Sequence, residues 1–271
     1  MDAPSFVYGT AWKEDRTRSL VEVALARGFR AIDTANQRRH YHEAGVGEAL
    51  AAAFAGGFLR EDLWLQTKFT YVRGQDHRLP YDPAAPVAAQ VQQSFESSLA
   101  HLHVTYLDSY VLHGPAMRYG LHPSDWEAWR AMEELAGEGK ARVIGVSNVT
   151  AEQLEELCDG ARVAPAWVQN RCYAQLGWDA DVRAVCRARG IRYQGFSLLT
   201  ANGPVLASGP VRKLASALGR TPAQVVFRFA RQVGMVPLTG TTDPAHMTED
   251  LGIDGFELAE ADVRALERIA T

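Results

Sequence analysis

Residues 107–147 read LDSYVLHGPAMRYGLHPSDWEAWRAMEELAGEGKARVIGVS, and they decide the fold class. The two outer parts, 107–113 and 142–147, are short apolar runs of the kind that forms buried strands. The part between them has the apolar spacing of a helix, and Ser124 with Glu127 fits a capping box at its start. The stretch therefore predicts a strand, a helix and a second, parallel strand.

The same alternation continues toward both ends of the chain without a linker. Further strands are expected at 6–9, 31–33, 63–68, 167–171, 192–197 and 235–238. Further helix starts are predicted by the capping boxes Thr150 with Gln153 and Thr221 with Gln224, and by Pro222 and Pro244 at first helical positions. The chain has no G-x-G-x-x-G and no P-loop, which disfavours a doubly wound nucleotide-binding sheet. We therefore expect one closed (β/α)8 TIM barrel, a single domain over residues 1–271, with its active site at the carboxyl ends of the strands.

Composition excludes several classes of partner. The chain has 271 residues, of which 47% are hydrophobic and 22% charged, and its formal net charge is -4. No basic patch marks a nucleic-acid partner, and no apolar stretch is long enough to span a membrane. Three cysteines without a C-x-x-C pair, and an N-terminus unlike a signal peptide, predict a cytoplasmic protein with free thiols. Neither the histidines at 40 and 42 nor those at 101 and 103 have a third ligand at zinc spacing, so no metal is expected.

Three neighbouring predicted strands end on residues that can carry chemistry. Asp33 closes the second strand, Lys68 the third and His113 the fourth. Each alone has an ordinary structural explanation. Because parallel strands end at the same mouth of a barrel, we expect a carboxylate, an ammonium and an imidazole to meet there.

The segments around these residues resemble the aldo-keto reductase family along nearly the whole chain. The similar blocks, in order, are GFRAIDTA, EAGVGEAL, DLWLQTK, YLDSYVLHGP, GKARVIGVSN and TPAQVVFRFA. The resemblance implies a (β/α)8 barrel that binds a nicotinamide cofactor without a Rossmann fingerprint and reduces aldehydes or ketones. It also implies that Asp33, Lys68 and His113 are three members of an Asp-Tyr-Lys-His tetrad.

The tyrosine of that tetrad is where this sequence departs from the family pattern. The stretch NQRRHYH precedes Glu43; counting from Asp33 reaches Arg38, and counting back from Glu43 reaches His40. The only tyrosine is Tyr41, which we favour as the proton donor, with His40 as the alternative. A nearby ammonium lowers the pKa of a phenol, whereas it opposes protonation of an imidazole.

The resemblance also assigns roles to the other three members. Asp33 would keep Lys68 protonated, and His113 would hydrogen-bond the carbonyl oxygen of the substrate.

Family positions on the remaining strands form the expected cofactor site. The resemblance implies that Ser147, Asn148 and Gln169 hold the nicotinamide carboxamide and that Phe196 stacks on the nicotinamide ring. The other cofactor-binding residues expected are Gly9, Thr10, Ser197, Leu198, Thr239, Gly240, Thr241, Thr242, His246 and Asp250.

The stretch PLTGTTDPAHMTED, 237–250, departs from the family at the end that holds the 2′-phosphate. Leu238 stands at the family's lysine position, His246 nearest its arginine and Asp250 nearest its asparagine. The Gly-Thr-Thr loop still leads into a helix N-terminus, which favours anions. We therefore expect NADPH, with NADH also possible.

The substrate end of the site is the least specified. Trp12, His40 and Phe69 are candidate pocket residues, and the long loop 69–86 with Tyr71 and Tyr81 is expected to cover part of the pocket. The last helix, from about Glu260, lies close to the end of the chain, which predicts an open pocket. The predicted protein is a monomer or weak homo-oligomer that acts on a small-molecule carbonyl compound. The alternative is a cofactor-binding regulatory or sensor module with little turnover.

Overall fold

Eight parallel strands pair in chain order, and β1 pairs with β8 as well as with β2, so the sheet closes into a barrel. The computed structural model describes residues 4–270. The strands are β1 (Val7–Gly9), β2 (Ala31–Asp33), β3 (Trp64–Phe69), β4 (Leu107–Leu112), β5 (Ala141–Ser147), β6 (Trp167–Arg171), β7 (Arg192–Phe196) and β8 (Met235–Thr239). The predicted barrel and its eight strands are confirmed, and β2 and β6 have the predicted bounds.

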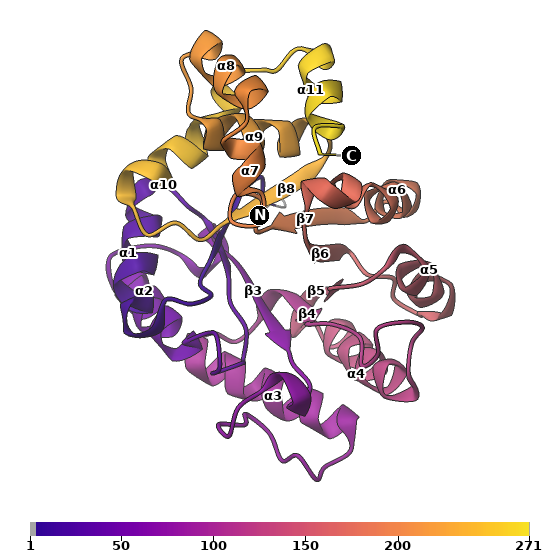
Figure 1. Ribbon diagram of the computed structural model, residues 1–271. Helices are drawn as coiled ribbons and strands as arrows, with labels where there is room; N and C mark the ends of the chain where they lie inside the picture. Colours follow the sequence, from indigo (N-terminus) through magenta and orange to yellow (C-terminus); the bar gives the residue numbers. More distant parts are fainter. Residues whose placement is uncertain (1–3, 271) are drawn as a thin grey trace.

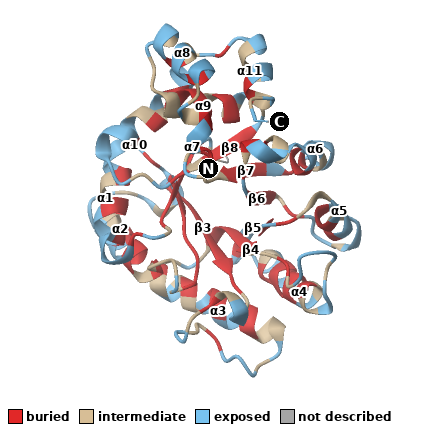
Figure 2. Ribbon diagram, in the orientation of Figure 1, coloured by how far each residue is buried: buried red, intermediate tan, exposed pale blue. Residues whose placement is uncertain are grey.

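Helices surround the strands, as Figure 1 shows. They are α1 (Thr17–Arg27), α2 (Glu43–Ala55), α3 (Val87–Leu102), α4 (Pro123–Gly137), α5 (Ala151–Gly160), α6 (Ala180–Arg189), α7 (Gly203–Leu206), α8 (Gly209–Leu218), α9 (Pro222–Gln232), α10 (Pro244–Leu251) and α11 (Glu260–Glu267). Short 3-10 helices span Glu14–Arg16, Arg60–Asp62, Val72–Gly74, Ala174–Asp179 and Gly252–Gly255. Figure 2 shows buried residues on the strands and exposed ones on the outer faces of the helices.

Capping patterns fix where several of these helices begin. Thr150 caps α5 and Thr221 caps α9 as predicted, each with a reciprocal glutamine bond. The predicted box at Ser124 is wrong, because α4 begins one residue earlier, at Pro123, and His122 is its cap. Proline at the first helical position sets this start, since its missing N–H has no partner there in any case.

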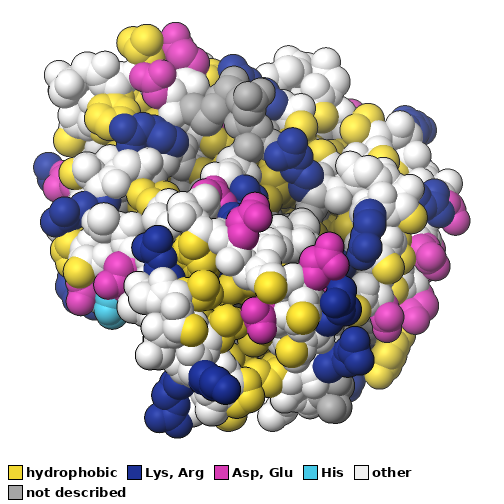
Figure 3. All heavy atoms as spheres, turned by 90° about the horizontal axis from the view of Figure 1, so that it is seen from above, with side chains coloured by type: hydrophobic (Ala, Val, Ile, Leu, Met, Phe, Trp, Pro, Cys, Tyr) yellow, Lys and Arg dark blue, Asp and Glu magenta, His cyan; other side chains and the backbone are white. Residues whose placement is uncertain are grey.

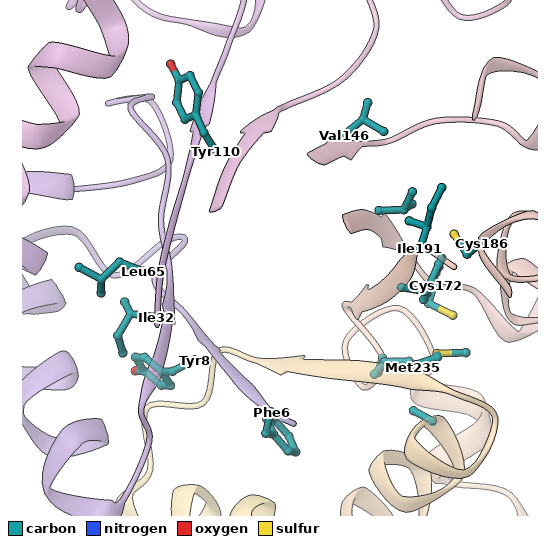
Figure 4. Close-up of a cluster of buried hydrophobic side chains, with 14 of the residues drawn as sticks. Phe6, Tyr8, Ile32, Leu65, Tyr110, Val146, Cys172, Cys186, Ile191 and Met235 are labelled. Atoms are coloured by element: carbon teal, nitrogen blue, oxygen red, sulfur yellow. The ribbon is translucent and has the colours of Figure 1, made fainter. Parts of the chain in front are cut away.

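Strand alternation divides the interior into two apolar regions. Side chains such as Tyr8, Ile32 and Leu65, from three neighbouring strands, belong to the larger region (Figure 4), which also holds buried helix residues. Inside the barrel, Trp64 and Trp167 pack edge to face with ring centroids 5.4 Å apart. The opposite directions of neighbouring side chains along each strand therefore determine which residues reach the mouth.

The surface carries both signs of charge. Figure 3 shows acidic and basic side chains interspersed on one face of the molecule. Within residues 4–270, no helix is both long enough and apolar enough to cross a bilayer.

Gly145→Ala tests the packing inside the barrel. Gly145 of β5 lies opposite Trp167 of β6, and a Cβ atom at 145 would lie 2.7 Å from the Trp167 carbonyl oxygen. Overpacking of this kind costs about 1–3 kcal/mol, so the midpoint of urea unfolding should fall. Gly137→Ala in α4 is the matched control, because a Cβ there meets nothing within 4 Å. Equal midpoints for the two variants would contradict this account.

Candidate active site

A buried ion pair forms the centre of the barrel mouth. Lys68 Nζ donates to both carboxylate oxygens of Asp33 at 2.7 Å and to the carbonyl oxygen of Thr34 at 2.8 Å. Gln66 and Gln169 also donate to Asp33 Oδ1, at 2.7 and 3.0 Å. The pair is therefore fixed in position by neutral amides below it, which is the condition under which a buried ion pair is tolerated.

Tyr41 and His113 lie beside this pair, as the sequence predicted. The Tyr41 ring centroid is 5.1 Å from Lys68 Nζ and 6.0 Å from the His113 ring centroid. His113 Nδ1 contacts the Thr70 hydroxyl at 2.7 Å, so Nε2 is the nitrogen left for the site. The structure thus brings Asp33, Tyr41, Lys68 and His113 together.

The pKa of Tyr41 differs in direction from what the sequence predicted. Burial, followed by the charge of Asp33, raises the pKa of Tyr41, whereas Lys68 was expected to lower it. The reason is that burial disfavours the phenolate and the negative charge of Asp33 opposes it as well, and burial also lowers the pKa of Lys68. Burial and the Lys68 charge lower the pKa of His113 to about 3, so its imidazole is neutral near neutral pH.

His40, the alternative proton donor, lies at the rim of the mouth. Its ring stacks on Trp12, with centroids 4.0 Å apart, and Trp12 is 67% exposed. Burial and then Arg39 lower the pKa of His40, which reduces its protonated fraction. The geometry and the charge state both favour Tyr41 over His40.

Phe69 is wrong as a pocket residue. It follows Lys68 on β3, so its side chain points to the opposite face of the strand, where it is fully buried against Tyr71 and Tyr81. Tyr81 donates to the Thr70 carbonyl oxygen and Tyr71 to Asp125. The hydrogen bonds of both tyrosines thus hold the loop 69–86 against the barrel and its helices.

The residues expected to bind the nicotinamide lie at the ends of β5, β6 and β7. Ser147 Oγ donates to the Gln169 carbonyl oxygen at 2.5 Å, and Asn148 Nδ2 donates to the His113 carbonyl oxygen at 2.8 Å. The Gln169 amide is committed to Asp33 and to Gln194. Phe196 is half-buried at the end of β7.

Three residues in the loops that follow strands have left-handed backbone conformations. Trp12 has φ of 62°, Asn148 of 55° and Ser197 of 56°. Such conformations are uncommon for residues other than glycine and cluster at functional sites. They follow β1, β5 and β7, at the same mouth as the tetrad.

A second cavity, of about 490 Å³, lies where the 2′-phosphate end of a cofactor was expected. Thr239, Thr241, His246 and Asp250 line it, together with Glu249. The remaining lining residues, mostly apolar, are Leu199, Gly203, Leu206, Ala207, Thr221, Pro222 and Ala223. The lining is thus an apolar wall facing hydroxyls, one imidazole and two carboxylates.

The other predicted cofactor residues have different positions. Gly9 closes β1 and packs under Leu238, since a Cβ at 9 would lie 2.5 Å from Leu238 Cδ2. Thr10 is buried and bonds the Asp33 carbonyl oxygen. The Leu198 side chain is buried in the core, so only its backbone can face a ligand. Gly240 and Thr242 belong to the loop but do not line the cavity.

Two cations at the mouth were missed by the sequence analysis. Lys13 is 7% exposed, and its Nζ donates to the carbonyl oxygen of Gly240, across from β1 to the loop after β8. No ion pair between Lys13 and a carboxylate occurs in the described part of the chain. Arg171, at the end of β6, donates to Ser197 Oγ at 3.2 Å and lies over the Phe196 ring. The signal available was a basic residue at the end of a predicted strand, for Arg171, and in the loop after one, for Lys13.

Comparisons with known proteins agree with this geometry. A model of the Aldo/keto reductase family matches residues 7–271. Aldo-keto reductase MT3049 of Mycobacterium tuberculosis is 34% identical over 255 residues, which cover 93% of this chain and 82% of that protein.

Solved structures give the same result. An aldo/keto reductase of Brucella melitensis has a TM-score of 0.83 at 27% identity, covering 98% of this chain and 95% of that one. The silkworm aldo-keto reductase AKR2E5, solved in complex with NADPH, has a TM-score of 0.82 at 25% identity, covering 98% and 84%.

Asp250→Asn tests the buried carboxylate of the second cavity. Burial raises the pKa of Asp250 to about 6, whereas an unfolded aspartate titrates near about 3.9. The native state binds this proton more tightly, so the free energy of unfolding falls as pH rises between the two values. Removing the charge should therefore stabilise the protein by about 2 kcal/mol at pH 8 and by much less at pH 4.

Thermal unfolding at the two pH values measures this effect. Glu156→Gln, an exposed carboxylate on α5 away from this cavity, is the control and should not be stabilised in this way. An Asp250→Asn variant that is equally stabilised at both pH values would contradict the assignment.

Proposed function

This chain belongs to the aldo/keto reductase family of NAD(P)H-dependent oxidoreductases, and on that premise we propose that it reduces small aldehydes or ketones to alcohols with Tyr41 as proton donor. The observation that carries the proposal is the buried Lys68–Asp33 pair with the Tyr41 ring 5.1 Å from Lys68 Nζ. A phenol, an ammonium and a neutral imidazole at one strand-end mouth supply both a proton and charge stabilisation. We propose that the whole chain acts as one domain.

Tyr41 carries the proton in this proposal. Its phenol is protonated throughout the neutral range, and because burial makes it a weaker acid, it gives up the proton only as strong negative charge develops on the substrate oxygen. A bound reduced nicotinamide supplies the hydride to the carbonyl carbon. Tyr41 then gives its proton to the carbonyl oxygen as negative charge develops there. The resulting phenolate is stabilised by the Lys68 ammonium, which Asp33 holds in place.

His113 orients the carbonyl in the same proposal. Its imidazole is neutral, and with Nδ1 engaged by Thr70 it can donate from Nε2 to the carbonyl oxygen. A neutral donor does not compete with Tyr41 for the role of acid. The stacked Trp12 and His40 form one wall of the substrate pocket at the rim.

The residues of the mouth fit a nicotinamide dinucleotide. We propose that Ser147, Asn148 and Gln169 bind the carboxamide and that Phe196 stacks on the ring. The cavity lined by Thr239, Thr241 and Asp250 would take the adenosine end. These assignments follow the family positions, and the hydroxyl, amide and aromatic groups present suit them.

Lys13 and Arg171 are proposed to bind cofactor phosphates. A buried ammonium that donates to the neutral Gly240 carbonyl oxygen, with no carboxylate paired to it among the described residues, is costly unless a ligand supplies negative charge. These two cations offset the absence of a lysine at 238. We therefore propose NADPH as the cofactor, with NADH as the alternative that Glu249 and Asp250 would favour.

We also place the protein in the reducing cytoplasm. Cys158, Cys172 and Cys186 are free, and burial raises the pKa of both Cys172 and Cys186 to about 12. Thiols in this state are poor nucleophiles and are expected to remain structural.

Tyr41→Phe tests the proton donor. Removing a positioned general acid costs about 100- to 10,000-fold, so kcat for NADPH-dependent reduction of an aromatic aldehyde should fall by this factor. The Kd of NADPH, measured by quenching of tryptophan fluorescence, should stay within about twofold because the ring and its packing remain.

Two further variants serve as controls for Tyr41. Tyr119→Phe removes a hydroxyl from a tyrosine that is 71% exposed and should leave kcat unchanged. His40→Gln should reduce kcat far less than Tyr41→Phe. The reverse order would assign the proton to His40, and wild-type turnover no faster than background would refute the reductase proposal.

Lys13→Met tests the phosphate site. Loss of a charge-assisted hydrogen bond of about 1.5–3 kcal/mol should raise the Kd of the nucleotide by about 10- to 100-fold. If Lys13 binds the pyrophosphate, NADH and NADPH weaken equally; if it binds the 2′-phosphate, only NADPH weakens. Lys213→Met, on the exposed face of α8, is the control. Unchanged affinity for both nucleotides would exclude Lys13 from the site.

A further inference from the structure

Glu43, the first residue of α2, is a buried carboxylate outside the barrel wall. It is 4% exposed. Its Oε1 accepts from the Thr67 hydroxyl at 2.5 Å, and its Oε2 lies 3.1 Å from His101 Nδ1. A layer between strands and helices is usually apolar, and a charge there is costly unless it is fully partnered. Because burying the Glu43 carboxylate is costly, we looked to its contacts for a role beyond packing.

The position of Glu43 links two members of the tetrad. Tyr41 lies two residues before Glu43, and Lys68 directly follows Thr67 on β3. Because neighbouring strand residues point to opposite faces, Thr67 points out of the barrel and Lys68 points in. The Glu43–Thr67 bond therefore ties the Tyr41 loop to the strand residue behind Lys68.

Gly47 allows His101, at the end of α3, to approach Glu43. It lies one helical turn after Glu43, and a Cβ at this position would lie 1.8 Å from the His101 carbonyl oxygen. Only glycine permits the end of α3 to come so close to α2. This contact places His101 beside Glu43, 58 residues away in the sequence.

The charges around β3 balance only if His101 carries a proton. Asp33 and Glu43 are two buried carboxylates, whereas Lys68 supplies one buried ammonium. The His101 side chain is 40% exposed and, with Glu43 and Tyr41, lines a cavity of about 390 Å³. His101 can therefore exchange its proton with solvent while its partner remains buried.

We propose that Glu43 is a positioning residue: held by Thr67 and by protonated His101, it fixes Tyr41 against Lys68 and couples proton transfer to the charge of His101. The inference rests on the proposed function, because it assumes that Tyr41 donates the proton. Glu43 touches neither substrate nor cofactor in this scheme. It acts through the two residues to which it is tied.

Several other charged or titratable groups face this cluster, and they bear on its pH dependence. They are Arg38 and Tyr41 in the loop after β2, His42 before α2, Arg78 in the loop after β3, Lys68 on β3, Asp33 on β2 and Tyr110 on β4. Arg38 pairs with Glu14 and Arg78 with Asp76, so each guanidinium has a carboxylate partner outside the cluster. Among the described titratable groups around Glu43, His101 is the one that forms a hydrogen bond with it.

The direction of the pH effect follows from the charges. The hydrogen bond that His101 donates to Glu43 raises the pKa of His101 above its ordinary value of 6.5. As pH rises through that pKa, His101 becomes neutral and Glu43 loses its positive partner. The unpaired negative charge opposes formation of the Tyr41 phenolate, so carbonyl reduction slows.

Glu43→Gln tests the proposal, since glutamine keeps the shape and can still accept from Thr67. We expect kcat to fall about 10- to 100-fold, the loss typical of a misplaced catalytic group, with KM and the Kd of NADPH within about threefold. The pH profile of kcat should also lose the inflection that belongs to His101. Glu48→Gln, an exposed carboxylate one turn along α2, is the control and should change neither.

Two further variants keep the test open if Glu43→Gln does not fold. His101→Gln should remove the same inflection, whereas His103→Asn, at the exposed end of the same helix, should retain it. Thr67→Val should lower kcat, and Thr67→Ser, which restores the hydroxyl, should recover it.

Failure of this inference is distinguishable from failure of the proposed function. Wild-type protein without turnover would refute the reductase proposal itself. Turnover in the wild type with unchanged kcat and pH profile in Glu43→Gln would overturn the role of Glu43. A purely structural role would instead lower the melting temperature and weaken NADPH binding together. NMR titration of His101, whose pKa should fall in Glu43→Gln, checks the pair without any turnover.

Discussion

The buried ion pair between Lys68 and Asp33 is the constraint on which the interior of this barrel depends. Two charges leave water there, and their attraction compensates only when the remaining donors and acceptors are also satisfied. Gln66, Gln169 and the Thr34 carbonyl provide those partners. The polar groups near the mouth form hydrogen bonds with the ion pair. The tryptophans inside the barrel fill the rest of its interior. Catalytic chemistry and barrel packing are therefore separated along the barrel axis.

Much of the architecture could be predicted because it depends on local pattern. Strand periodicity and glutamine capping boxes are short-range signals, and Thr150 and Thr221 begin their helices as expected. The end of β2 at Asp33 followed from the same signals, whereas β3 ends at Phe69, one residue after the predicted Lys68. The error at Phe69 was avoidable, because a residue next to an inward lysine must point outward. At Ser124, two overlapping capping patterns competed, and the one containing proline determined the helix start.

What sequence could not predict depends on contacts made only when the barrel closes. Lys13 meets Gly240 across 227 positions, and Glu43 meets His101 across 58. Residue types alone also gave the wrong direction for the pKa of Tyr41. Burial of the phenol, and after it the negative charge of Asp33 beside Lys68, raises that pKa. Burial and the charges that folding brings together determine the pKa of Tyr41, and neither can be read from the sequence alone.

The two ends of the proposed cofactor site differ in how closely they match the family pattern. At the tetrad end, the family groups occupy the family positions. At the other end, Leu238 replaces a lysine, and its side chain packs against Gly9, where a Cβ would lie 2.5 Å away. Position 238 has thus become part of the apolar packing, so a lysine could not return there without displacing it. In the proposed function, positive charge at this end comes from Lys13, whose ammonium reaches the loop two residues beyond Leu238. Nucleotide binding would then depend on a cation in the loop after β1, apart from the groups proposed for proton transfer.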